Sequence, residues 1–123
     1  MKNTIISALG KWTERLGLRW WMVDVHWHKG KDAKKYFSAG EDETVLARVF
    51  ADWRYAEANI HINLPAWKGM SNEDVERAIV HELMHILVNE MREGELHHEE
   101  RVVTCLTKAV LWVDQFARGE NAR

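Results

Sequence analysis

The segment HELMH, residues 81–85, contains the residue types that a catalytic zinc centre requires. Residues four positions apart on an α-helix are separated by about 40° around the axis and about 6 Å along it. His81 and His85 can therefore bind one metal ion through their imidazole nitrogens. Glu82 lies about 100° from His81, outside the ligand direction but within reach of a water on the metal. The pattern predicts two zinc ligands and one general base, which accepts a proton as water attacks a carbonyl and then passes it to the leaving amine.

A third protein ligand is expected downstream, because a catalytic zinc takes three protein ligands and keeps one open position. Gly94 allows the chain to turn, so the next helix can return against the HELMH helix. The candidates in that helix are His97, His98, Glu99 and Glu100. Averaged around the helix axis, the apolar side chains of this helix point closest to the direction of Glu99. A metal ion that lies beside the core, and not within it, instead favours Glu100, which is at the flank of the apolar stripe. The residues alone leave this choice open.

Hydrophobic periodicity predicts the elements that position these residues. Apolar residues at helical spacing predict a helix over 4–16, and alternating residues predict strands over 19–28, 45–54 and 59–64, the last two joined as a hairpin near 55–58. The segment 29–43 carries Gly and mixed charge with little periodicity, so we expect a long loop.

Two further helices complete the predicted order. Ser71 is an expected N-cap of a helix that continues to about Asn89, with Glu73 and Asp74 in its first turn. A last helix is expected from about His98 to Phe116. The residues expected to face inward on these two helices are Val75, Ala78, Ile79, Leu83, Ile86, Leu87, Val102, Val103, Leu106, Ala109, Val110 and Val113. The order of elements predicts one α+β domain over residues 1–123, with helices on the apolar side of a small twisted sheet.

Composition excludes several classes of function. The chain has 123 residues, which suits one domain, and a formal net charge of −2, so it has no basic surface for nucleic acid or an anionic membrane. No apolar run reaches membrane-spanning length, and we interpret the N-terminal apolar stretch as a structural helix and not as a signal peptide. With one cysteine, an internal disulfide is impossible, and we expect a cytoplasmic protein. The composition does not indicate an oligomeric state.

HELMH followed by a downstream glutamate resembles the gluzincin branch of zinc metallopeptidases. The stretch EERVVTCLTKAVL is similar to the third-ligand helix of the ImmA/IrrE-like peptidases, in which Ala-Asn stands three and four positions after the Glu, and apolar and small residues six and seven positions after it. Counted from Glu100, the corresponding residues are Val103, Thr104, Leu106 and Thr107. Counted from Glu99, the residue four positions later is not polar, so the pattern is not matched. The resemblance implies that Glu100 is the third ligand and that Thr104 is a hydrogen-bond partner behind the ligands, although Thr replaces the usual Asn or Asp.

The same resemblance implies a minimal zincin-like fold that hydrolyses peptide bonds in a protein or peptide substrate, with an edge strand that pairs with the extended substrate. In the ImmA/IrrE-like group the usual role is cleavage of a repressor protein. SprT-like peptidases share the minimal layout but use a third histidine, which would here be His97 or His98. A further alternative is a regulatory or binding module that retains zinc without proteolysis.

Several residues outside HELMH are compatible with either a chemical or a structural role. Asp24, His26 and His28 share one strand face and His61 lies on another, which is compatible with a second metal site. We favour a solvated strand face, because nothing in the sequence makes these residues converge. The candidates for stabilising an oxyanion are Tyr36, Tyr55, His97, His98 and Arg101. Cys105 is interpreted as a small core residue.

Overall fold

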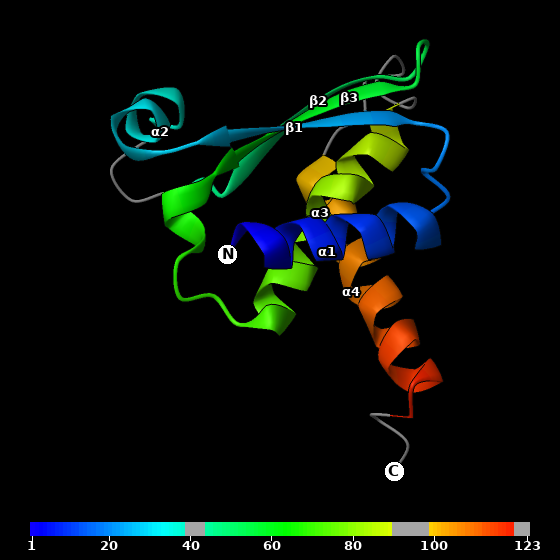
Figure 1. The fold of residues 1–123 in the computed structure, drawn as a ribbon. Coiled ribbons are helices and arrows are strands. Elements are labelled where there is room, and N and C mark those ends of the chain that lie inside the picture. The colour runs from blue at the N-terminus through cyan, green and yellow to red at the C-terminus, as the bar shows by residue number, and fades with distance from the viewer. Residues whose placement is uncertain (39–43, 90–98, 120–123) are drawn as a thin grey trace.

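The computed structural model describes residues 1–38, 44–89 and 99–119, and these form an α+β fold (Figure 1). The helices and strands are α1 (Lys2–Arg15), β1 (Met22–His28), α2 (Gly30–Tyr36), β2 (Ala47–Asp52), β3 (Glu57–Asn63), the 3-10 helix η1 (Leu64–Trp67), α3 (Asn72–Val88) and α4 (Glu99–Ala117). The predicted fold class is confirmed at this level, as are the positions of α1, the three strands, α3 and α4.

The sheet has the strand order β1-β3-β2. β1 and β3 form a parallel pair, with His26 opposite His61. β2 and β3 form an antiparallel pair, with Arg48 opposite His61. The predicted hairpin between β2 and β3 is confirmed, and its turn ends at Ala56, which has a φ of 51°. β2 is therefore an edge strand, with one side of its backbone paired to β3.

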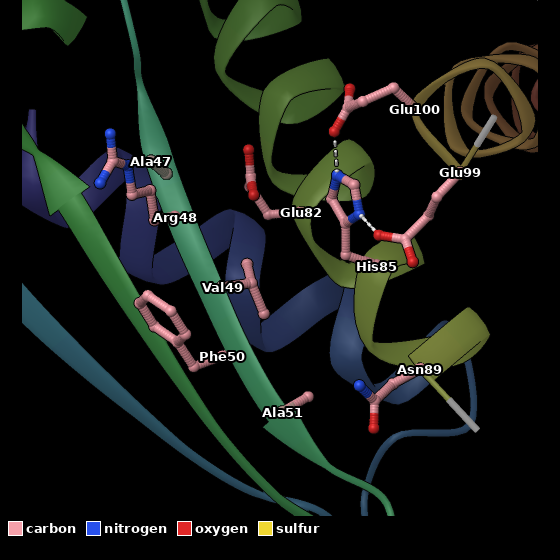
Figure 2. Close-up of a pocket in the computed structure, with 10 residues that line it drawn as sticks. All are labelled: Ala47, Arg48, Val49, Phe50, Ala51, Glu82, His85, Asn89, Glu99 and Glu100. Atoms are coloured by element: carbon pink, nitrogen blue, oxygen red, sulfur yellow. Dashed lines mark hydrogen bonds and ion pairs between the residues drawn. The ribbon is translucent and has the colours of Figure 1, made fainter. Parts of the chain in front are cut away.

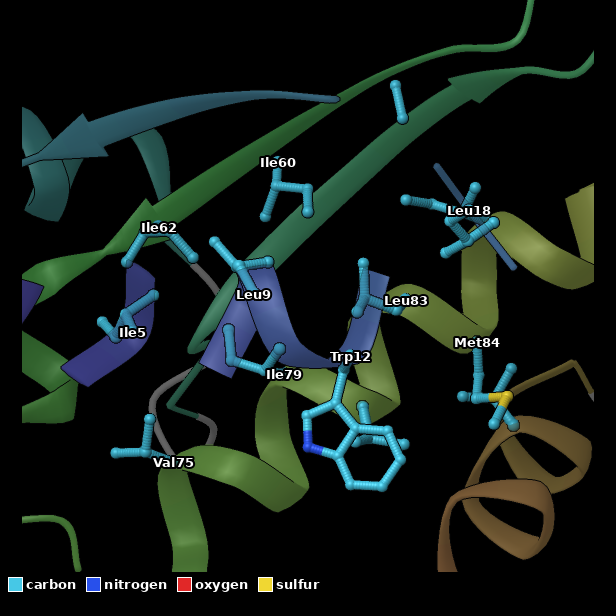
Figure 3. Packing of buried hydrophobic residues seen from close by; sticks show 14 of the residues in the cluster. Ile5, Leu9, Trp12, Leu18, Ile60, Ile62, Val75, Ile79, Leu83 and Met84 are labelled. Atoms are coloured by element: carbon cyan, nitrogen blue, oxygen red, sulfur yellow. The ribbon is translucent and has the colours of Figure 1, made fainter. Parts of the chain in front are cut away.

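The core lies between one face of the sheet and the helices α1 and α3 (Figures 1 and 3). The helical spacing of α1 places Ile5, Leu9 and Trp12 inward, and the alternation of β3 places Ala58, Ile60 and Ile62 against them. The indole N–H of Trp12 donates to Glu76 Oε1 at 2.7 Å, and Lys11 pairs with the same carboxylate. These contacts fix α1 across α3.

α3 begins where the sequence predicts. The Ser71 hydroxyl accepts a hydrogen bond from the backbone N–H of Asp74 at 3.1 Å, which satisfies one of the free amide groups of the first turn. Seven side chains of α3 are buried, so the helix cannot rotate without exposing them: Val75, Ile79, Val80, Leu83, Met84, Ile86 and Val88. Leu87 was predicted to face inward and is exposed instead.

The prediction of a loop over 29–43 is wrong for its first half, because Gly30–Tyr36 forms the helix α2. Residues 39–43 lie outside the described part of the chain. α2 has only seven residues, too few for a periodic apolar pattern, and tertiary contacts stabilise it. The ring of Tyr36 stacks on those of His28 and His61, on the face of the sheet away from the core.

α4 packs along α3, but with a narrower contact face than the sequence predicts. Val103 and Thr107 are buried, and Val110 and Leu111 are partly buried. Val102, Leu106 and Val113, which were expected to face inward, are exposed along with Ala109. The apolar stripe of α4 is wider than the surface that α3 offers, so packing decides which part of it is covered.

Charged contacts hold the C-terminal half of α4. Asp114 pairs with Arg15 at the end of α1 and, at 2.9 Å, with Arg118 one turn later on α4. Among the described residues, no helix is both long enough and apolar enough to cross a membrane.

Candidate metal centre

The two histidines of HELMH project from the same side of α3. Their ring centroids are 5.1 Å apart and the ring planes are at 72°. The side chain of His81 is 26% exposed and that of His85 is 15% exposed. Both are partly buried because the neighbouring Val80, Leu83 and Met84 direct the adjacent face of the helix into the core. Burial lowers the pKa of His81 and favours the neutral imidazole, which is the form that binds a metal ion.

Glu100, in the first turn of α4, reaches both histidines. Its carboxylate oxygens lie 3.1 Å from His81 Nε2 and 2.7 Å from His85 Nε2. One potential ligand atom from each of these three residues lies within 4.8 Å of the other two. Two imidazoles and one carboxylate are the donor set of one class of catalytic zinc site, so the residues fit that metal. We call His81, His85 and Glu100 the metal triad.

The structure separates the roles of the two adjacent glutamates. The Glu99 carboxylate lies 2.7 Å from His85 Nδ1, the ring nitrogen on the side away from Glu100 (Figure 2). Glu99 therefore contacts the ring behind the triad, whereas Glu100 contacts the nitrogens that face it. The two histidine alternatives, His97 and His98, lie outside the described residues.

Thr104 does not take the position that the resemblance implies. Within the described part of the chain, its hydroxyl makes no hydrogen bond to His81 or His85, and the carboxylate behind His85 belongs to Glu99.

Glu82 lies beside the triad, between α3 and β2 (Figure 2). Its side chain is partly buried. Burial raises the pKa of its carboxyl to about 8, and the nearby Glu100 carboxylate contributes to the rise. A carboxyl group that titrates near neutral pH can both accept and return a proton.

His85 and Glu100 of the triad line a cleft of about 540 Å³ between α3 and the edge strand β2 (Figure 2). Its lining residues are Ala47, Arg48, Val49, Phe50, Ala51, Glu82, His85, Asn89, Glu99 and Glu100. A second cavity of about 550 Å³ shares Ala47, Glu82 and Glu100 with this cleft and continues past His81 toward Met70 and Arg77. The two hollows therefore extend to both sides of Glu82 and the triad.

Sequence reasoning missed two parts of this site. The alternation of 45–54 predicted a strand, but periodicity does not tell which strand lies at the edge beside α3. Asn89 was predicted only as the end of the helix, and no local signal marks it as a residue that lines the cleft.

The histidines on the other face of the sheet do converge, contrary to expectation. The parallel register places the rings of His26 and His61 in a stack at 4.5 Å, and His28 Nε2 lies 2.9 Å from His61 Nδ1. His28 Nδ1 in turn lies 2.9 Å from Asp32 of α2. Burial, followed by the charges of His26 and His28, lowers the pKa of His61. Among the described residues, only the metal triad brings three such ligand atoms within 4.8 Å of one another, so the second metal site is not supported.

The remaining described candidates line neither of the two cavities beside the triad. Tyr36 stacks on the histidine cluster and Tyr55 is exposed in the turn between β2 and β3. Arg101 is exposed next to Glu100. Cys105 is exposed, so its interpretation as a core residue is wrong: it falls on the part of the apolar stripe that α3 does not cover.

Comparison of this chain with protein-family models, with curated proteins and with solved structures finds no match.

Proposed function

We propose that this chain is a zinc-dependent metallopeptidase of the gluzincin type, with His81, His85 and Glu100 as zinc ligands and Glu82 as general base. The observation that carries the proposal is the convergence of four side chains from two helices. Two imidazoles and a carboxylate face one point, and a carboxyl group with a pKa raised to about 8 lies beside them in an open cleft. A minimal zincin-like fold is consistent with this arrangement.

His81, His85 and Glu100 would hold the zinc ion, which would supply Lewis-acid chemistry that makes water nucleophilic near neutral pH and polarises a carbonyl group. The chain's own residues do the rest. α3 and α4 hold the three donor groups in place. Glu82 accepts the proton of the attacking water and delivers it to the departing amine, as its position in the cleft and its raised pKa support.

The cleft fits a peptide in an extended conformation. β2 pairs with β3 on one side, and its residues 47–51 line the cleft on the other. An extended peptide can add to such an edge strand through backbone hydrogen bonds. Because cavities lie on both sides of Glu82 and the triad, substrate residues can be accommodated on both sides of the bond that is cleaved. We therefore propose an internal segment of a protein as substrate.

The test compares the purified parent with Glu82→Gln. Metal content is measured by mass spectrometry, and cleavage is measured on an unfolded protein and on a mixed peptide library. We expect about one zinc per chain in both proteins and a cleavage rate at least about 100-fold lower in the variant, because removing a general base costs that much or more. Glu73→Gln, an exposed change on the same helix, serves as the control and should cleave like the parent.

The outcomes separate the alternatives. A parent that binds zinc but cleaves nothing would support a binding or regulatory module. Equal cleavage by the parent and Glu82→Gln would refute the assigned base. A parent that binds no zinc at neutral pH would refute the metal centre.

A further inference from the structure

We infer that Glu99 is a positioning residue, which orients His85 and fixes the tautomer in which its Nε2 is free to bind the metal. The inference rests on the proposed function of the metal triad. It assigns a role to a residue that offers no ligand atom to the triad.

The contacts of His85 carry the first step. Its Nδ1 lies 2.7 Å from Glu99 and its Nε2 lies 2.7 Å from Glu100. Carboxylates accept hydrogen bonds, so each ring nitrogen faces an acceptor in the metal-free protein. A metal ion held by Glu100 would take the lone pair of Nε2, and the ring would then keep its one proton on Nδ1, where Glu99 accepts it. Metal-binding histidines commonly donate their second ring N–H to a carboxylate in this way.

Burial distinguishes the two glutamates. The Glu99 side chain is 15% exposed, like that of His85, whereas the Glu100 side chain is 72% exposed. Burying a carboxylate is unfavourable unless charged or strong hydrogen-bond partners compensate. The ring of His85 is a hydrogen-bond partner of the Glu99 carboxylate. Glu99 also lies in the first turn of α4, where the positive end of the helix dipole stabilises an anion.

Helix geometry explains how adjacent residues reach opposite sides of one ring. Consecutive side chains on a helix diverge by about 100°, so Glu99 and Glu100 approach His85 from different directions. Val103, one turn later and fully buried, fixes the rotation of α4 that both contacts need. His81 has no equivalent support, since within the described residues no carboxylate contacts its Nδ1. His85 is therefore the ligand whose orientation α4 controls on both sides.

The test measures zinc affinity by chelator competition for the parent, Glu99→Gln, Glu99→Ala and Glu100→Ala, with Glu73→Gln as the control for loss of one charge. We expect Glu99→Ala to weaken zinc binding by about 10–100-fold, the range typical of partners behind a ligand. Glu99→Gln should weaken zinc binding less, because its amide oxygen still accepts a hydrogen bond from Nδ1. Glu100→Ala removes a ligand and should weaken zinc binding the most.

The absorption spectrum of the Co²⁺-substituted protein supplies a second measurement. It reports the ligand set, so we expect both Glu99 variants to keep the visible bands of the parent and Glu100→Ala to change them. If Glu99→Ala changed the bands as Glu100→Ala does, Glu99 would be a ligand and the inference would fail. It would fail equally if both Glu99 variants bound zinc as tightly as the parent.

Folding controls keep these outcomes interpretable. The free energy of unfolding of each metal-free variant is measured in urea, and if Glu99→Ala does not fold, the isosteric Glu99→Gln decides. If the parent binds zinc and cleaves substrate, and the Glu99 variants bind zinc as tightly, only this inference fails. If the parent does not bind zinc, the proposed function fails as well.

Discussion

The side-chain oxygen of Asn89 accepts a hydrogen bond from the backbone N–H of Trp53 at 3.0 Å. Asn89 is the C-cap of α3, and Trp53 directly follows β2. This bond therefore joins the two walls of the cleft at one end. Asn89 is 8% exposed, so little water competes for the bond.

We predict that Asn89→Ala lowers the free energy of unfolding by about 1–3 kcal/mol, because the amide N–H of Trp53 loses its acceptor. Urea unfolding of the metal-free protein measures the change. Asn72→Ala, an exposed change at the opposite end of α3, should stay within about 0.5 kcal/mol of the parent. Similar losses in both variants would show that the bond does not join the walls.

Leucines one turn apart on α3 test how strongly the core positions the HELMH helix. Leu83 is 0% exposed and Leu87 is 41% exposed. We expect Leu83→Ala to cost about 2–5 kcal/mol of unfolding free energy, through lost burial and the cavity that remains. Leu87→Ala should cost well under half of that, as measured by urea unfolding. A larger loss at Leu87 would contradict the rotation of α3 described above.

Zinc should stabilise the fold through the triad. A ligand at about 100 times its dissociation constant raises the free energy of unfolding by about 2.7 kcal/mol if it binds only the folded state. We therefore expect added zinc to raise the melting temperature of the parent, and of His26→Ala, whose histidine lies on the other face of the sheet. His85→Ala should lose the effect. If His26→Ala lost it instead, zinc would bind at the histidine cluster.

The raised pKa of Glu82 predicts a pH dependence in the metal-free protein. Between about 4.5, the ordinary pKa, and about 8, the folded state holds a proton that the unfolded state releases. Stability therefore falls as the pH rises through this window and levels off above it, with a total of at most about 5 kcal/mol. Glu82→Gln cannot ionise, so it should be the more stable protein at pH 8 and lose this slope. Parallel stability curves for both proteins would count against the burial of this carboxyl.

The sequence by itself determined the local features of this protein. The capped helix around HELMH, the alternating strands and the class of the fold follow from periods of 3.6 and 2 residues, which are properties of neighbours along the chain. His81 and His85 share a face of α3 for the same reason, since four residues nearly complete a turn. Those features depend on no contact between distant segments.

Only the tertiary structure decided which carboxylate faces the histidines and which strand lies beside them. Glu99 and Glu100 are adjacent in sequence, and their roles depend on the rotation of α4, which Val103 and Thr107 set by packing on α3. The helix α2, the convergence of His26, His28 and His61, and the hydrogen bond from Trp53 to Asn89 likewise come from segments far apart in sequence. Such contacts depend on which apolar surfaces cover one another, and a periodic pattern shows only that a surface exists.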